Sequence, residues 1–241
     1  MADNKTATET ILTGVEEIDE QLCGGIPAGS LGLIEGQPSA GKSVLCQHLT
    51  SNTLRSQGSA VAYYTTENSV RGLITQMDSL SLHSLDHFLT DRLRIYPLVW
   101  HDDLEDTGKP LRVLCHHIAS LPKHFRLVIV DTITLLAAHS SPAPVLDFLL
   151  ACKEICGQGR IVLLVVDSHT FGRETLSRAI SLCDFHLRLR LEEVGCRLMS
   201  VLEVPKMRGA RPFAEKDISF EVKPKLGICK LPYSKARATA V

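Results

Sequence analysis

The feature that most constrains the fold of this chain is an eight-residue segment, Gly36–Ser43, which reads GQPSAGKS. It fits the pattern G-x-x-x-x-G-K-[ST], whose backbone N–H groups surround a polyphosphate. An apolar run at residues 30–35 precedes it and predicts a buried strand, and apolar residues at helical spacing follow at residues 44–49. A glycine-rich turn could match by chance, but strand, loop and helix are the context that the pattern requires. The segment therefore predicts phosphate binding at a helix N-terminus, where unpaired N–H groups and the helix dipole favour anions.

Two side chains of this segment have expected roles in holding a nucleotide. Lys42 would place a mobile positive charge between the β- and γ-phosphates, and the Ser43 hydroxyl would hold Mg²⁺. The expected nucleotide contacts in this part of the chain are Gly36, Gln37, Pro38, Ser39, Ala40, Gly41, Lys42, Ser43 and Val44.

Composition fits one large α/β domain and excludes some other classes of protein. The chain has 241 residues, 44% of them hydrophobic and 22% charged, which is enough to fill one core. We expect residues 1–10, which are polar, to be flexible and residues 11–241 to form a single domain. The net charge of −1 gives no global field that would attract nucleic acid or a membrane. We find no apolar run near the roughly 20 residues that span a bilayer.

The eight cysteines are scattered, and no secretory leader precedes them, so we expect reduced thiols and a cytoplasmic location. Two groups of residues leave metal binding open as an alternative. Cys152 and Cys156 are one helical turn apart, and Cys115 is followed by His116 and His117. Buried thiols on a helix face are the commoner explanation of such spacing.

Two nearly continuous apolar runs, residues 127–130 and 161–166, indicate strands covered on both faces, as in a parallel sheet between helices. From Phe185 the pattern changes to an alternation that predicts a one-sided antiparallel strand, a turn at residues 192–195 and a return over 197–204. Other expected strands are 60–66, 93–98, 217–222 and 227–230, and expected helices are 13–22, 44–57, 69–77, 110–121 and 144–156. The sequence thus predicts a mostly parallel α/β sheet, flanked by helices and finished by an antiparallel C-terminal edge.

Acidic residues follow two of these strands. Asp131 comes directly after residues 127–130, and ligands of open α/β sheets bind at the carboxyl ends of strands, so we expect Asp131 to face Lys42 and the metal. An Asp at this place can also be a helix cap. Asp167, with Ser168 and His169, follows the next strand and is either a γ-phosphate sensor or a polar strand exit.

Glu67 follows the strand at residues 60–66. It is the candidate general base for an attacking water, if it comes within hydrogen-bond reach of that water. Alternatively, Glu67 and Asn68 only begin the helix that starts at Ser69. The sequence favours neither interpretation.

Beyond these motifs, the chain contains three further segments: Thr13-Gly14-Val15, Gly24-Gly25-Ile26-Pro27 and Lys206-Met207-Arg208-Gly209. Together with Asp19, Gly29-Ser30 and Gly36–Ser43, they resemble the KaiC-like branch of the RecA superfamily, over residues 13–238. This resemblance implies a RecA-like P-loop NTPase core that binds ATP and Mg²⁺, with Asp131 as the acid that supports the metal. It also implies that Lys206 and Arg208 reach the γ-phosphate bound by a neighbouring subunit, whereas the residues alone favour a solvated charge pair on an edge strand.

Within that branch the chain is most similar to the archaellum ATP-binding subunits. This similarity implies a regulatory component that forms a hexameric ring with ATP on the cytoplasmic side of the motor. The implied partners are the archaellum motor ATPase and a membrane-anchored scaffold. Active KaiC-like ATPases tend to carry two adjacent glutamates where this chain has Glu67-Asn68, and asparagine cannot accept a proton as a carboxylate does. We therefore expect weak hydrolysis or none.

Two other functions are consistent with parts of the sequence. A RecA-like accessory recombinase that binds DNA would use the basic C-terminal segment, although aromatic residues for base stacking make up only 5% of the chain. An autokinase of the circadian type usually needs two KaiC domains, and this chain has one. The acidic stretch at residues 101–106 is either a docking surface for a basic partner or a solvated loop.

Overall fold

The computed structural model describes residues 9–99, 108–138, 140–168, 172–194, 197–208 and 217–231. Within these ranges, nine strands form one sheet in the order β11-β10-β9-β8-β3-β7-β6-β4-β5. Their bounds are β3 Leu31–Gly36, β4 Ala60–Thr65, β5 Leu93–Pro97, β6 Phe125–Asp131, β7 Ile161–Asp167, β8 Phe185–Val194, β9 Arg197–Met207, β10 Asp217–Lys223 and β11 Gly227–Lys230. A separate antiparallel pair joins β1, Thr10–Ile11, to β2, Ile26–Pro27.

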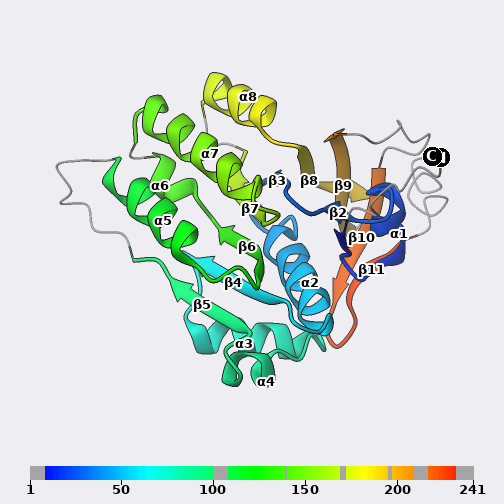
Figure 1. The fold of residues 1–241 in the computed structure, drawn as a ribbon. Coiled ribbons are helices and arrows are strands. Elements are labelled where there is room, and N and C mark those ends of the chain that lie inside the picture. Colours follow the sequence, from blue (N-terminus) through cyan, green and yellow to red (C-terminus); the bar gives the residue numbers. More distant parts are fainter. Residues whose placement is uncertain are drawn as a thin grey trace, which may run out of the picture.

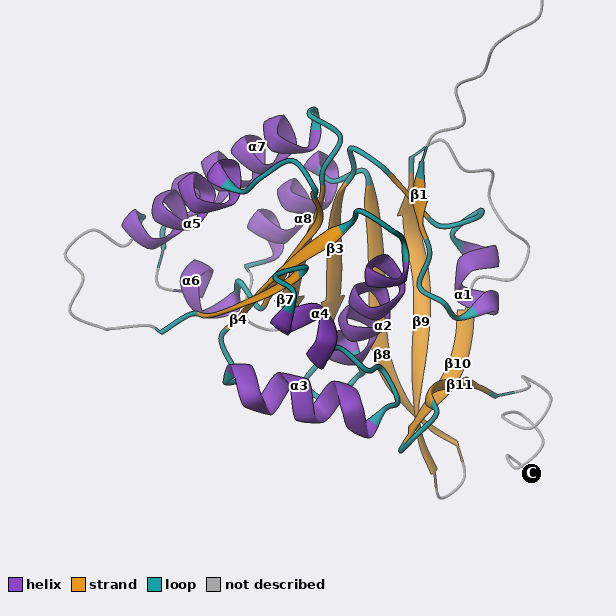
Figure 2. Ribbon diagram, turned by 60° about the horizontal axis from the view of Figure 1, so that its bottom comes forward, coloured by secondary structure: helices purple, strands orange, loops and turns teal. Residues whose placement is uncertain are grey.

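Helices cover both faces of the parallel part of the sheet (Figures 1 and 2). Their bounds are α1 Glu16–Gln21, α2 Lys42–Arg55, α3 Val70–Ser79, α4 Leu85–Leu89, α5 Lys109–Ser120, α6 Thr134–Ala138, α7 Pro142–Cys156 and α8 Arg173–Leu182. One apolar cluster packs α2 and α3 against the sheet, and another packs α5 and α7 against the opposite face. This arrangement explains why β6 and β7 are apolar at nearly every position.

Pairing is parallel from β8 through β3, β7, β6 and β4 to β5, and antiparallel from β8 to β11. The predicted architecture is therefore confirmed. The strand at Phe185 differs in detail, because β8 pairs parallel with β3 on one side and antiparallel with β9 on the other. Both of its faces are covered at its start: Phe185 and Leu187 lie in the core, and His186 is buried on the opposite face. Arg188 and Arg190, which follow on the same face as His186, are partly exposed.

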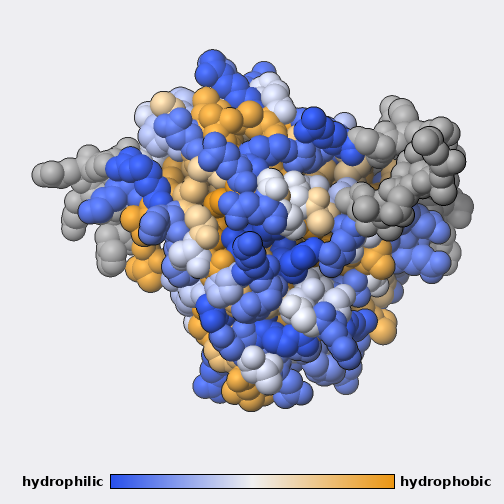
Figure 3. All heavy atoms as spheres, viewed as in Figure 1, coloured by the Kyte–Doolittle hydropathy of each residue, from blue (hydrophilic) through white to orange (hydrophobic). Residues whose placement is uncertain are grey.

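Several short elements were not predicted, namely β1, β2, α4, α6 and α8. α4 and α6 have five residues each, too few for a periodic pattern, and α8 buries only Ala179 among its ten residues. β8 also continues to Val194, into the turn predicted for residues 192–195. Among the described residues, no helix combines the length and apolar character needed to cross a bilayer. Hydrophilic residues dominate the face seen in Figure 3, with apolar residues gathered mainly around α7 and α8.

Candidate functional site

The segment Gly36–Ser43 links the end of β3 to the start of α2, as predicted. Two of its glycines are required by geometry. A Cβ on Gly36 would lie 2.5 Å from the backbone oxygen of Leu189, and Gly41 has φ of 95°, a conformation that side chains disfavour. The loop therefore passes close to β8 and turns sharply into the helix.

The N-terminus of α2 is open to an anion. This 14-residue helix has no side-chain cap from a described residue, and its first turn contains no acidic side chain. The first N–H groups of a helix lack partners within the helix, and they carry the positive end of its dipole. A phosphate group would satisfy both, so the observed end fits a polyphosphate.

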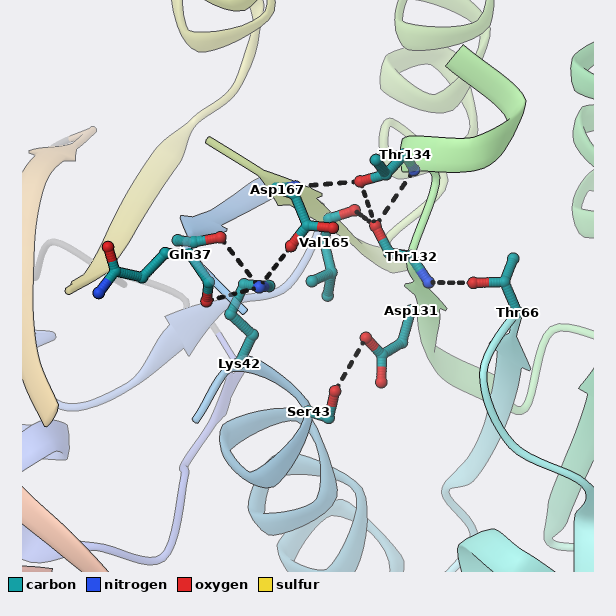
Figure 4. A network of polar contacts seen from close by, with 10 residues as sticks. Gln37, Lys42, Ser43, Thr66, Asp131, Thr132, Thr134, Val165 and Asp167 are labelled. Atoms are coloured by element: carbon teal, nitrogen blue, oxygen red, sulfur yellow. Dashed lines mark hydrogen bonds and ion pairs between the residues drawn. The ribbon is translucent and has the colours of Figure 1, made fainter. Parts of the chain in front are cut away.

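The Lys42 side chain lies back over the loop, and its ammonium group has three acceptors (Figure 4). Nζ donates to the backbone oxygens of Gly36 at 2.9 Å and Gln37 at 3.0 Å, and to Asp167 Oδ1 at 2.6 Å. The side chain of Lys42 is 9% exposed and that of Asp167 is 23% exposed. The ammonium group is thus paired with Asp167, the last residue of β7 and one of the two strand-end acids found in the sequence.

Asp131, the last residue of β6, contacts Ser43, the residue that follows Lys42. The Ser43 hydroxyl donates to Asp131 Oδ1 at 3.2 Å, and the Tyr63 hydroxyl donates to Asp131 Oδ2 at 2.6 Å. Burial raises the pKa of Asp131, although both hydroxyl groups and the nearby Lys42 act in the opposite direction. A serine hydroxyl beside a carboxylate is an oxygen donor set that suits Mg²⁺, so these residues fit the metal implied by the loop.

Threonine side chains hold the strand ends around these acids in place (Figure 4). Thr132 Oγ1 donates to the backbone oxygen of Val165 at 2.6 Å, and the N–H of Thr132 donates to Thr66 Oγ1 at 3.3 Å. The N–H of Asp167 donates to Thr134 Oγ1 at 3.0 Å. These bonds tie the carboxyl ends of β4, β6 and β7 together. Sequence reasoning missed this network, and a threonine soon after each of two strands was the available signal.

Glu67 lies just beyond β4, on the exposed rim of the site. Burial raises its pKa, and the carboxylates of Asp131 and Asp167 raise it further, so the three acids lie near one another. The cap of α3 is Ser69, whose hydroxyl accepts from the N–H of Gly72 at 3.1 Å. Glu67 is therefore not the residue that caps this helix.

Lys206 and Arg208 lie at the opposite end of the sheet. Lys206 Nζ donates to the backbone oxygens of Ile180 at 2.7 Å and Ser181 at 2.9 Å, which caps the end of α8. Arg208 pairs with Asp184, whose other oxygen accepts from the N–H of Leu31 at the start of β3. The length of β3, about 16 Å, separates them from the loop of their own chain.

The remaining candidates do not form a metal site. Among the described residues, no group of three or more His, Cys, Asp or Glu side chains is arranged to hold a metal. Cys152 and Cys156 are buried on α7, and Cys115 is partly buried on α5. The acidic stretch 101–106 and His169 lie outside the described residues, as does much of the basic C-terminal segment.

Comparisons with known proteins agree with this geometry. A sequence model of the KaiC ATPase family matches residues 11–232. The archaeal flagellar ATP-binding protein FlaH of Sulfolobus acidocaldarius is 31% identical, over 95% of this chain and 99% of that protein. FlaH of Methanocaldococcus jannaschii is 30% identical, over 88% of this chain and 91% of that protein.

Solved structures of two proteins are similar to this chain in fold. The crystal structure of the flagellar accessory protein FlaH from Methanocaldococcus jannaschii superposes with a TM-score of 0.81 at 27% identity, covering 93% of this chain and 99% of that one. A KaiC-like protein from Pyrococcus horikoshii, at 19% identity and a TM-score of 0.74, shares the fold. The RecA-like architecture predicted from the sequence is thereby confirmed.

Proposed function

The chain belongs to the KaiC ATPase family, in its FlaH-like branch, and from this premise we propose that it binds ATP with Mg²⁺ and regulates the assembly of an archaellum motor. The observation that carries the proposal is the loop before α2. It combines a helix N-terminus that no described side chain caps, a buried lysine, and a serine beside a strand-end carboxylate. We propose that residues 11–241 act as one domain in this role.

The loop and Lys42 would bind the phosphates. Because the ammonium group of Lys42 already has three acceptors, a triphosphate must replace Asp167 as a partner of Nζ. Ser43 and Asp131 would hold Mg²⁺, which neutralises charge between the β- and γ-phosphates. The proposed contacts are those of residues 36–44, as expected from the sequence.

Hydrolysis is proposed to be slow or absent. Glu67 is the candidate base, and its raised pKa makes it a better proton acceptor once it is ionised. The next position holds Asn68, whose N–H donates to Thr65 Oγ1 at 3.1 Å and whose amide side chain cannot take a proton. A single carboxylate at positions 67 and 68 suits an ATP-occupied switch better than a fast motor.

Assembly is proposed to depend on Lys206 and Arg208. Their place at the far end of β3 means that they can act only on a nucleotide in another copy of the chain. A cation directed at a neighbour's γ-phosphate would couple ATP binding to a ring, which we propose is a hexamer. That ring would sit at the cytoplasmic side of the membrane, against the motor ATPase and a membrane-anchored scaffold.

The test is to purify the full chain and measure its melting temperature and mass by light scattering, with and without Mg·ATP. ATP binding only to the folded state adds about 2.7 kcal/mol of stability at a hundredfold excess over Kd, so the melting temperature should rise. The mass should shift toward a hexamer, and turnover on the same sample should be slow. Lys42→Ala is the control: ATP should change neither its melting temperature nor its mass.

Three outcomes would change the proposal. If titration of the folded protein with Mg·ATP releases or absorbs no heat, the proposal that the chain binds the nucleotide is wrong. Identical elution of the apo and ATP-loaded forms would remove the assembly role. Salt-sensitive binding to single-stranded DNA, lost when basic residues of the C-terminal segment are replaced, would favour an accessory recombinase instead.

A further inference from the structure

Each of the two carboxylate oxygens of Asp131 accepts a hydrogen bond from a hydroxyl group. Ser43 on α2 donates to Oδ1, and Tyr63 on β4 donates to Oδ2 at 2.6 Å. We propose that Tyr63 is a positioning residue of the Mg²⁺ site: its hydroxyl fixes one oxygen of Asp131 and thereby orients the other toward Ser43 and the metal. This inference rests on the proposed function.

The packing of Tyr63 does not by itself explain why its side chain carries a hydroxyl group. The side chain is fully buried, in the apolar cluster that also contains Leu45 and Leu49 of α2. A phenylalanine would fill almost the same space, so packing alone does not require the oxygen. A buried hydroxyl group needs a hydrogen-bond partner, and here that partner is the acid at the end of the neighbouring strand β6.

Fixing Asp131 matters because the terminal torsion of an aspartate is broad, and its two oxygens exchange places easily. A bond from Ser43 alone leaves the carboxylate free to rotate, and the Ser43 hydroxyl must itself face the metal. A second donor on the opposite oxygen removes that freedom. Hydrogen bonds to a charged acceptor are short and strong, as the 2.6 Å distance from Tyr63 indicates.

The adjacent residue provides a matched control. Tyr64 follows Tyr63 on β4, so its side chain enters the opposite apolar cluster, and it is also buried. Its hydroxyl hydrogen-bonds His117 Nδ1, again at 2.6 Å. Tyr63→Phe and Tyr64→Phe therefore each remove one buried, hydrogen-bonded hydroxyl from the same strand, but only the first removes it from Asp131.

Calorimetry at a series of Mg²⁺ concentrations tests the proposal on the full chain. For Tyr63→Phe we expect the Mg²⁺ concentration that gives half of the metal-dependent gain in ATP affinity to rise about tenfold. Affinity for ATP in the presence of EDTA should be unchanged, and Tyr64→Phe should match the wild type in both measurements. Equal Mg²⁺ dependence in the two variants would overturn this inference alone. A wild-type protein that does not bind Mg·ATP would overturn the proposed function together with it.

A spectroscopic measurement on the wild type covers the case in which Tyr63→Phe does not fold. The chain has only four tyrosines, so ¹³C labels at Cζ give four signals, which single replacements of the other three assign. Adding Mg²⁺ to protein saturated with ATP should shift the signal of Tyr63 and leave that of Tyr64 in place. An unmoved Tyr63 signal under these conditions would contradict a positioning role.

Discussion

The two ends of strand β3 both carry ion pairs, and the carboxylates at these ends differ in how well nearby positive charges compensate them. At the loop end, burial raises the pKa of Asp131 and of Glu67. Neighbouring carboxylates raise both pKa values further, and the nearby Lys42 only partly opposes this. At the other end, burial would raise the pKa of Asp184, but Lys153, the N–H of Leu31 and Arg208 together lower it.

This contrast distinguishes the proposed ligand site at the loop end from the salt-bridged cluster around Asp184 at the other end. At the loop end the carboxylates of Asp131, Asp167 and Glu67 outnumber the nearby Lys42, so this end would be stabilised by a cation such as Mg²⁺ bound with phosphates, as proposed. Asp184 already joins the start of β3, the helix α7 and the end of β9. We therefore propose that the first end binds the nucleotide of its own chain, whereas at the second end Asp184 has a structural role beside the proposed contact of Lys206 and Arg208 with a neighbour's nucleotide.

The largest effect should come from replacing the lysine at each end. Lys42→Ala should weaken ATP binding by at least about a hundredfold, because the phosphates lose a desolvated charge. Lys153→Ala, which removes a partner of Asp184, should lower the melting temperature and leave ATP affinity within about twofold. Isothermal titration calorimetry and thermal melts on both variants measure this. Equal losses of ATP affinity would mean that the two ends are not distinct.

A buried histidine on α2 predicts a pH dependence of stability. The N–H of Ile228 donates to His48 Nε2 at 3.1 Å, and burial, with Arg55 nearby, lowers the pKa of His48 from 6.5 to about 4. The unfolded chain binds this proton below about pH 6.5 and the folded chain only below about pH 4. The free energy of unfolding should therefore fall by about 3 kcal/mol as the pH falls through this window.

The control is His48→Gln, which keeps an acceptor but does not titrate. Chemical denaturation of both proteins at several pH values gives the difference between their unfolding free energies. That difference should change steadily from pH 6.5 to 4 and be flat above pH 7. A constant difference over the whole range would show that His48 does not supply this pH dependence.

Neutralising the acid at each end should affect stability in different ways. Asp184→Asn should cost about 2 kcal/mol of unfolding free energy, since Lys153 and Arg208 lose their carboxylate. Asp131→Asn should cost little or stabilise the fold, because burial disfavours the charge of Asp131, and the amide oxygen can still accept from Tyr63. Denaturant unfolding of the two variants measures both changes in unfolding free energy. A larger loss for Asp131→Asn would reverse the comparison.

The smallest predicted effect concerns hydrolysis at the loop end. Asn68→Glu would place a second carboxylate beside Glu67 and should raise ATP turnover about tenfold from its slow basal rate. Asn68→Gln has a similar size without a charge and should leave turnover unchanged. Phosphate release measured for both variants tests this prediction. Equal turnover would show that Asn68 is not what limits hydrolysis.

Much of the fold followed from local patterns. The continuous apolar runs gave β6 and β7, and the alternation at Phe185 gave the start of β8. Hydrophobic periodicity could not reveal α4 and α6, because one turn of helix does not repeat. It also could not show that β8 lies inside the sheet, since strand order depends on contacts between distant segments.

The sequence by itself determined the loop and the acid at the end of β6, because a glycine-rich turn into a helix and the end of a buried strand are properties of contiguous residues. Only the tertiary structure decided which groups meet there. Lys42 and Asp167 are 125 residues apart, and Tyr63 and Asp131 are 68 apart. Each pair forms because parallel strands bring their ends to one edge of the sheet. The same sheet, about 16 Å long at β3, keeps Lys206 and Arg208 away from that edge.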